Sequence, residues 1–207
     1  MTNNWLIRAL EESRARGFLG PGPIEPHISH ALGFAACWDE RFNAPPSAFL
    51  DLGSGGGLPA LVLLDHWHLR GVLTDSMKKR ANFLQEALDW DDAPSTGEVI
   101  TGRIEDIARF PELVEAFDLV TARSFGPPSV TAECGVRFLR IGGLMVVSEP
   151  PDDEVTNRWS GPALLELGLE DRGRVRHGAA FQVLVKVKAT PATFPRATGI
   201  PGKKPLF

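Results

Sequence analysis

The sequence contains little cysteine and no long apolar segment, and these absences exclude several classes of protein. Only two cysteines, Cys37 and Cys134, occur among 207 residues, so a disulfide-stapled scaffold is excluded. The longest apolar run, Leu58 to Leu64, has seven residues, whereas a membrane-spanning helix needs roughly 20. Charged residues follow directly on the short apolar patch near the N-terminus, so no secretory leader is recognisable. We therefore expect a cytoplasmic protein that depends on its hydrophobic core.

The charged residues are unevenly distributed along the chain. The formal net charge is −4, which by itself argues against a nucleic-acid-binding protein. Residues 172–207, however, contain eight lysines and arginines and no acidic residue, so the first 171 residues carry a net charge of −12. This asymmetry predicts either an anionic partner near the C-terminal end or two strands with basic outward faces. The five histidines show no spacing typical of metal ligands, and we expect no bound metal.

The hydrophobic pattern predicts an α/β protein with a short N-terminal helical extension. Residues 1–19 and 28–38 have helical periodicity, and helix-breaking residues follow each of them. From residue 47 onward, short apolar segments alternate with longer amphipathic ones, which is typical of a parallel sheet with helices on both faces. The predicted strands are residues 48–52, 71–74, 98–101, 117–122, 144–148 and an antiparallel pair, 169–176 and 180–188. The predicted helices between them are residues 58–67, 77–88, 129–139 and 163–167.

A glycine-rich segment, Asp51-Leu52-Gly53-Ser54-Gly55-Gly56-Gly57, links the first predicted strand to the next helix. Glycine at such a turn lets the backbone approach a ligand closely, because a Cβ atom there would collide with it. A nicotinamide-dinucleotide site would require another glycine at position 58, where the chain has Leu58. The D-x-G-x-G-x-G spacing instead resembles motif I of the class I S-adenosylmethionine (SAM) methyltransferases, which would make SAM the cofactor.

Two acidic residues follow later strands at positions suited to an adenosine group. Asp75 ends the second predicted strand, where a carboxylate can accept hydrogen bonds from both ribose hydroxyls. Glu105 follows the third strand, at the level where an adenine ring would lie against Ile104. Both residues support a nucleoside cofactor, although nicotinamide enzymes also use an acidic residue at the position of Asp75.

Several segments together resemble the RsmG (GidB) family of SAM-dependent methyltransferases, which modify guanine N7 in 16S ribosomal RNA. They are residues 51–59 (DLGSGGGLP), 74–76 (TDS), 79–84 (KRANFL), 102–106 (GRIED), 117–125 (FDLVTARSF) and 194–206 (FPRATGIPGKKPL). The resemblance extends from about residue 47 to the C-terminus. It implies a class I methyltransferase (Rossmann-like) fold with a mostly parallel seven-stranded sheet. The expected division is an N-terminal helical extension (1–46), a SAM-binding domain (47–193) and a basic, proline-rich tail (194–207).

The motif positions and the resemblance together imply the residues of the site. The expected cofactor-binding residues are Asp51, Gly53, Gly55, Gly57, Leu58, Asp75, Ile104, Glu105 and Arg123, and Arg123 is also the expected catalytic residue. The expected substrate-binding residues are Phe125, which would stack on a base, and Arg196, Lys203 and Lys204 in the tail. The tail would form either an arm that grips RNA or an ordered strap beside the site.

Guanine N7 carries a lone pair and no proton, so its methylation needs positioning and no general base. The residues after the fourth strand, Arg123-Ser124-Phe125-Gly126-Pro127-Pro128, agree with this, because they lack the acid- or amide-Pro-Pro-aromatic set that binds an exocyclic amine. Residues 1–45 lack the asparagine-leucine-threonine segment of the family. Two alternatives therefore stay open: a methyltransferase of the same fold acting on a small molecule or protein, and a non-catalytic module that binds SAM or RNA.

Overall fold

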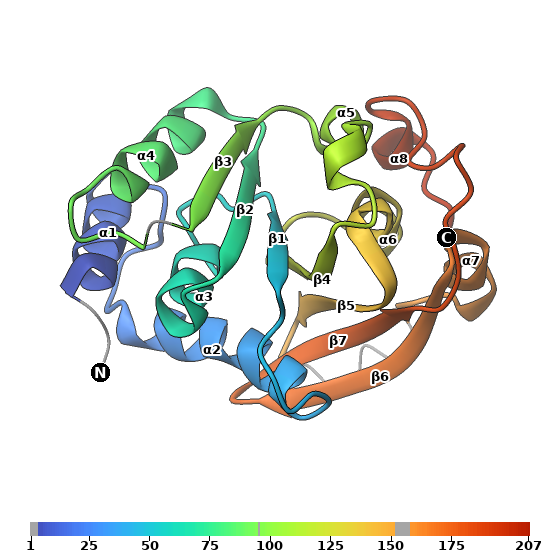
Figure 1. The fold of residues 1–207 in the computed structure, drawn as a ribbon, viewed down its shortest axis with the longest axis horizontal. Helices are drawn as coiled ribbons and strands as arrows, with labels where there is room; N and C mark the ends of the chain where they lie inside the picture. Colours follow the sequence, from blue (N-terminus) through green and yellow to red (C-terminus); the bar gives the residue numbers. More distant parts are fainter. Residues whose placement is uncertain (1–3, 95, 152–157) are drawn as a thin grey trace.

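A seven-stranded sheet with the strand order β3-β2-β1-β4-β5-β7-β6 lies at the centre of the computed structural model, which describes residues 4–94, 96–151 and 158–207 (Figure 1). Strands β1 to β5 pair in parallel, whereas β7 runs antiparallel to both β5 and β6. The strands are β1 (Ala48–Leu52), β2 (Arg70–Asp75), β3 (Gly97–Thr101), β4 (Phe117–Ala122), β5 (Leu139–Glu149), β6 (Leu169–His177) and β7 (Ala179–Lys186). This arrangement confirms the predicted mostly parallel sheet.

Helices cover both faces of the sheet (Figure 1). Four helices share one hydrophobic cluster with the sheet: α1 (Asn4–Ala15), α2 (Glu25–Asp39), α3 (Ala60–Trp67) and α4 (Lys78–Leu88). The cluster on the other face includes α5 (Ile104–Ile107), η1 (Pro111–Leu113), α6 (Pro128–Gly135), η2 (Val136–Phe138) and α7 (Gly161–Leu167). A last short helix, α8 (Ile200–Lys203), lies in the C-terminal tail. No helix within the described ranges combines the length and apolar character needed to cross a membrane.

Strand β1 lies at the point where the chain stops adding strands on one side of the sheet and begins to add them on the other. The chain runs from β1 outward to β2 and β3, with α3 and α4 on one face, and then continues on the other side of β1 with β4 and β5. In open α/β sheets, ligands bind in the crevice outside the carboxyl ends of the strands at such a point. The glycine-rich segment follows β1 directly, so the fold positions it at this crevice.

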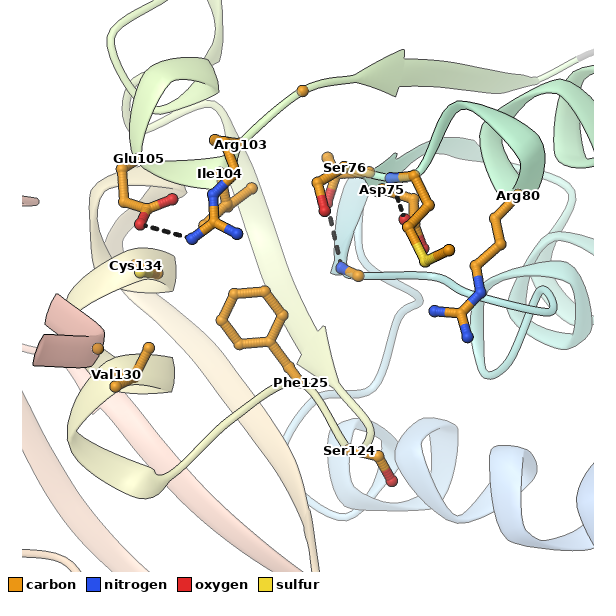
Figure 2. A pocket seen from close by; sticks show the side chains of 15 residues that line it. Asp75, Ser76, Arg80, Arg103, Ile104, Glu105, Ser124, Phe125, Val130 and Cys134 are labelled. Atoms are coloured by element: carbon orange, nitrogen blue, oxygen red, sulfur yellow. Dashed lines mark hydrogen bonds and ion pairs between the residues drawn. The ribbon is translucent and has the colours of Figure 1, made fainter. Parts of the chain in front are cut away.

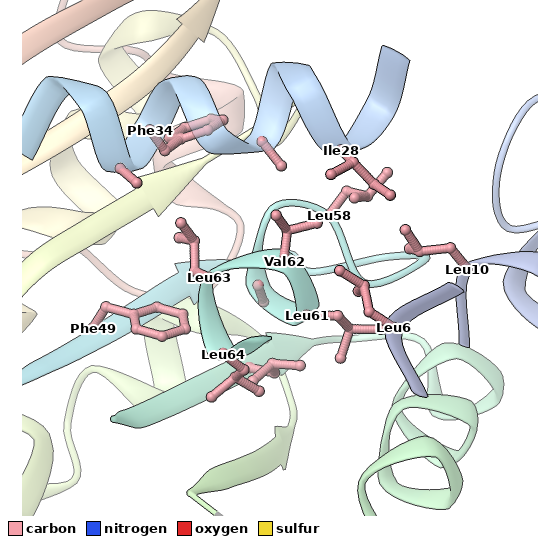
Figure 3. Close-up of a cluster of buried hydrophobic side chains, with 14 of the residues drawn as sticks. Leu6, Leu10, Ile28, Phe34, Phe49, Leu58, Leu61, Val62, Leu63 and Leu64 are labelled. Atoms are coloured by element: carbon pink, nitrogen blue, oxygen red, sulfur yellow. The ribbon is translucent and has the colours of Figure 1, made fainter. Parts of the chain in front are cut away.

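The N-terminal helices belong to the same core as the sheet. The first five residues of helix α3, residues 60–64, are apolar and at most 2% exposed, because this part of the helix lies between the sheet and two other helices. Figure 3 shows the side chains that surround it, namely Leu6 and Leu10 from α1, Ile28 and Phe34 from α2, and Phe49 from β1. Residues 1–3 of the first predicted helix lie outside the described residues.

The predicted helix over 129–139 and the predicted strand over 144–148 have the wrong bounds. Helix α6 ends at Gly135, and β5 already begins at Leu139. The fully buried Lys186 of β7 donates hydrogen bonds to the carbonyl oxygens of Val136 and Leu139, at 3.2 and 2.8 Å, which holds the chain in this turn. This contact spans 50 residues in one case and 47 in the other, so no local pattern indicates it.

The packing of α2 on β7 provides a test of whether the N-terminal helices belong to the core. An ideal Cβ atom on Gly33 would lie 2.5 Å from the Phe181 ring. Gly33→Ala should lower the free energy of unfolding by about 1–3 kcal/mol, because the buried ring must shift, and urea denaturation measures this. An ideal Cβ atom on Gly20 would have no other atom within 4 Å. Gly20→Ala should therefore change the free energy of unfolding by less than about 1 kcal/mol. Equal stability of the two variants would contradict close packing of α2 on the sheet.

Candidate functional site

The glycine-rich loop is held in place by the end of β2. The Ser54 N–H donates to the Thr74 carbonyl oxygen at 2.7 Å, and the Gly55 N–H donates to Asp75 Oδ2 at 2.9 Å. The Thr74 hydroxyl donates to the Asp51 carbonyl oxygen at 2.8 Å, which ties the end of β1 to the same strand. Thr74 was not among the predicted site residues, because a threonine at a strand end carries no distinctive motif. These bonds fix the loop against the ends of β1 and β2.

Two of the loop glycines are required for different reasons. Gly53 has φ +66°, and an ideal Cβ on it would lie 2.9 Å from the Phe125 ring, so a side chain would close the crevice. Gly57 has φ +99°, and a Cβ there would lie 2.4 Å from Leu61 Cδ1. Gly57 lines neither of the cavities described next. Its lack of a side chain therefore permits packing against α3, and a ligand contact at Gly57 stays a prediction.

Two adjoining cavities lie at the crevice, with volumes of about 260 and 270 Å³. They share Gly53, Arg80 and Ser124. Of the expected cofactor-binding residues, the first cavity contains Gly53, Asp75, Ile104 and Glu105, and the second contains Gly53, Gly55, Leu58 and Arg123. Small-molecule sites typically measure roughly 300–1,000 Å³, so the two cavities together have the size of such a site.

Asp75 lies at the wall of the first cavity and is 6% exposed. Its Oδ2 atom accepts the Gly55 N–H, and its Oδ1 atom accepts the Met77 N–H at 2.7 Å. Each carboxylate oxygen can accept a second hydrogen bond. The side chain is therefore fixed in orientation and retains the acceptor capacity that two ribose hydroxyls need.

Glu105 is 2% exposed and also lines the first cavity. Its Oε1 atom accepts the Gly199 N–H at 2.9 Å and a hydrogen bond from Arg103 at 3.1 Å. Burial alone would raise the pKa of this carboxyl group, but the Gly199 N–H and Arg103 outweigh burial and lower it. The Oε2 atom is buried without a hydrogen-bond partner among the described residues. An ionised acceptor is thus available for a donor group in the cavity.

Arg123 is partly buried at the wall of the second cavity. Its Nη2 atom lies 3.1 Å from Nδ1 of His27, a cavity residue that was not among the predicted site residues. Burial and the charge of Arg123 both lower the pKa of His27, which keeps the imidazole neutral near pH 7. Because a guanidinium group only donates, Nδ1 accepts and the proton of His27 lies on Nε2. The Nη1 atom of Arg123 is buried without a partner in the described part of the chain.

Asp51 lies beneath the loop and is fully buried. It lines neither cavity, and its expected role in binding the cofactor stays a prediction. Its Oδ1 atom accepts the Thr121 hydroxyl at 2.7 Å, and its Oδ2 atom has no partner among the described residues. Burial raises the pKa of Asp51 to about 6, although the hydrogen bond from Thr121 and the charge of Arg123 oppose this.

The unpartnered groups match the chemistry of SAM. Asp51 Oδ2 and Arg123 Nη1 are an anion and a cation with unused hydrogen-bonding capacity beside the loop, and the amino-acid end of SAM carries an ammonium and a carboxylate group. Asp75 and Glu105 offer acceptors for its ribose and adenine. The residues present therefore fit this cofactor. Among the described residues, no group of three or more His, Cys, Asp or Glu side chains could hold a metal ion.

The structure places several of the expected substrate-binding residues in surroundings that differ from the expected ones. Figure 2 shows the Phe125 ring in the middle of the first cavity, between Ile104 and Glu105 on one side and Asp75 on the other. The ring thus lies among the residues expected to bind the cofactor, and stacking on a target base there is not supported. Arg196 is bound to the buried Glu133 and is therefore not free to grip RNA as expected. Lys203 and Lys204 are exposed.

Comparisons with known proteins agree with this geometry. Residues 23–158 match the sequence pattern of a family described as rRNA small subunit methyltransferase G. A relative of that name from Roseiflexus castenholzii is 36% identical over 201 residues, which cover 89% of this chain and 80% of the relative. Another from Leuconostoc mesenteroides is 34% identical over 182 residues, which cover 83% and 74% of the two chains.

Among solved structures, the O-methyltransferase from Bacillus cereus in complex with SAH matches this chain with a TM-score of 0.60 and 16% identity. The match covers 91% of this chain and 92% of that one. At this identity the likeness shows the fold alone, and it confirms the predicted class I methyltransferase fold.

The buried carboxyl group of Asp51 predicts a pH dependence of ligand binding, and its sign follows from the raised pKa. With a pKa of about 6, the carboxyl group is mostly ionised at pH 7 and mostly protonated at pH 5. Only the ionised form attracts a cationic group, so the affinity for SAM should fall about tenfold from pH 7 to pH 5. Titration calorimetry at several pH values measures this. In Asp51→Asn the affinity should not change over the same range, and a wild-type affinity independent of pH would contradict the assignment.

Proposed function

The chain belongs to the rRNA small subunit methyltransferase G family, and from this premise we propose that it transfers a methyl group from SAM to N7 of a guanine in 16S ribosomal RNA. The family assignment makes the chain a SAM-dependent methyltransferase of 16S ribosomal RNA, and it excludes the nicotinamide alternative for the glycine-rich loop. The atom that accepts the methyl group, guanine N7, is the part of the proposal that goes beyond the family assignment.

The second cavity supports guanine N7 as the acceptor. None of the described residues that line it carries a carboxylate. Its imidazole and guanidinium groups, on His27 and Arg123, offer N–H donors, because the only imidazole lone pair is used by Arg123. The major-groove edge of guanine presents two acceptors, N7 and O6. A cavity of donors without a carboxylate base fits a reaction in which the attacking atom has no proton to lose.

The chain's own residues act by positioning. Bound SAM would supply an electrophilic methyl group. Asp75 would hold the ribose, and Glu105 with Ile104 would hold the adenine. Arg123 Nη1 would bind the cofactor carboxylate or guanine O6, while Nη2 stays bound to His27. Holding two reactants in the reactive geometry can lower a barrier by roughly 7–11 kcal/mol. No general base is required, because guanine N7 has no proton to lose.

Transfer of tritiated methyl groups from SAM to unmethylated 30S subunits and to free 16S ribosomal RNA tests the proposal. The label should appear at a single guanine and be released as 7-methylguanine after acid hydrolysis. Label in another base, or no transfer to either RNA while proteins or small molecules from a cell extract are labelled, would contradict it.

Arg123→Ala should reduce kcat/KM for RNA by about 100-fold or more, because a charged hydrogen-bond donor at the reacting groups is lost. The same methyl-transfer assay measures this loss. Arg172→Ala serves as a matched control, since Arg172 is an exposed arginine of β6 paired with Glu170 at 3.0 Å. A substantial activity in Arg123→Ala would remove the proposed role of this side chain.

Lys203 and Lys204 are exposed beside Gly202, which lines the first cavity, and we propose that they contact RNA phosphates. Each phosphate contact adds about one to the slope of log affinity against log salt concentration. The Lys203→Ala, Lys204→Ala double variant should therefore reduce this slope by about two and leave SAM binding unchanged. Filter binding of 16S ribosomal RNA at several salt concentrations measures the slope. An unchanged slope would place these lysines outside the RNA interface.

A further inference from the structure

The C-terminal strap, defined as residues 194–207, is fastened to helix α6 near both of its ends. Arg196 binds Glu133, and the Leu206 N–H donates to the Ser129 hydroxyl oxygen at 2.7 Å. Both partners belong to α6. In Figure 1 the strap, including α8, lies beside α5 and α6. The segment between these two anchors therefore forms an arch with a defined position.

The bond between Glu133 and Arg196 is the stronger of the two anchors. Glu133 is 0% exposed, and its carboxylate accepts the Arg196 backbone N–H at 2.8 Å, Nε at 2.9 Å and Nη2 at 2.6 Å. The hydrogen bonds to Glu133 raise the pKa of Arg196. Such two-pronged arginine–carboxylate contacts fix geometry as well as charge. Removing the arginine would leave a buried carboxylate without its cation.

The middle of the arch reaches the first cavity. The Thr198 hydroxyl donates to Asp106 Oδ1 at 2.5 Å, and the Gly199 N–H donates to Glu105 Oε1 at 2.9 Å. Gly202 lines the cavity itself, as does Cys134, the neighbour of Glu133 in α6. The strap thus holds one oxygen of Glu105, while the buried Oε2 atom has no partner among the described residues.

We propose that Arg196 and Glu133 are positioning residues for the cofactor, although neither lines the cavity. Their bond sets the place of the strap, the strap presents the Gly199 N–H, and this N–H orients the Glu105 carboxylate toward a donor group of the adenosine. The strap is therefore a functional wall of the cofactor site. The proposal rests on the proposed function only in taking SAM as the ligand, and it does not depend on which RNA nucleotide is methylated.

Titration calorimetry of the full chain with SAM, in the absence of RNA, tests the proposal. Arg196→Ala should raise the Kd for SAM by about tenfold, because Glu105 loses its fixed orientation. Arg196→Lys, which keeps the charge but not the two-pronged contact, should give an intermediate Kd. The matched control is Arg70→Ala, which removes an exposed arginine paired with Glu98 at 3.7 Å at the start of β2. Its Kd should stay within about twofold of the wild type.

A double-mutant cycle with Glu105→Gln separates positioning from general stabilisation. If Arg196 acts through Glu105, adding Arg196→Ala to Glu105→Gln should change the Kd by less than about twofold. A merely structural role would lower the melting temperature and leave the two effects on the Kd additive. Additive effects, or a wild-type Kd in Arg196→Ala, would overturn the proposal.

Three further outcomes have defined meanings. If Arg196→Ala does not fold, Arg196→Lys decides, and a wild-type Kd in that variant overturns the proposal. If the wild type itself fails to bind SAM, the cofactor assignment falls and the proposal falls with it. Loss of RNA methylation with intact SAM binding would contradict only the proposed function.

Discussion

The carboxylate of Asp75 holds the site together, because it joins three segments of the chain at one point. It accepts the Gly55 N–H of the loop after β1 and the Met77 N–H that precedes α4, while its own backbone ends β2. Side chains alternate between the two faces of a strand, so a shift of one residue between β1 and β2 would turn this carboxylate away. The register of the central strands therefore decides whether a cofactor can bind.

The same region contains buried polar atoms whose burial lowers the stability of the fold. Asp51 Oδ2, Glu105 Oε2 and Arg123 Nη1 are enclosed without a partner in the described part of the chain, and such groups are costly to bury. Asp51 and Arg123 stand at the carboxyl ends of the adjacent parallel strands β1 and β4, and Glu105 follows β3. Unsatisfied charge concentrated at a ligand crevice is typical of functional sites, where a ligand completes the hydrogen bonds.

The basic end of the chain performs several roles that net charge cannot distinguish. Lys186 is fully buried and binds backbone carbonyl oxygens at the junction of α6 and β5. Arg196 binds a buried glutamate that lies 63 residues earlier in the chain. Lys203 and Lys204 remain exposed. The basic residues at this end of the chain thus have three different roles. One stabilises the fold, one positions the wall of the cofactor site, and two are exposed where phosphate groups could contact them.

The sequence by itself determined the order of the strands and helices along the chain, the glycine-rich loop after β1, the acidic residue at the end of β2 and the one after β3. These features depend on local spacing and periodicity, which neighbouring residues set. Only the tertiary structure decided that Phe125 enters the cofactor cavity and that Asp51 lies beneath the loop. It also decided that His27 contacts Arg123 and that Arg196 binds Glu133 instead of RNA. Each of these outcomes depends on which distant segments the sheet brings together, because a side chain's partner and burial are set by packing across the fold and leave no mark in the local sequence.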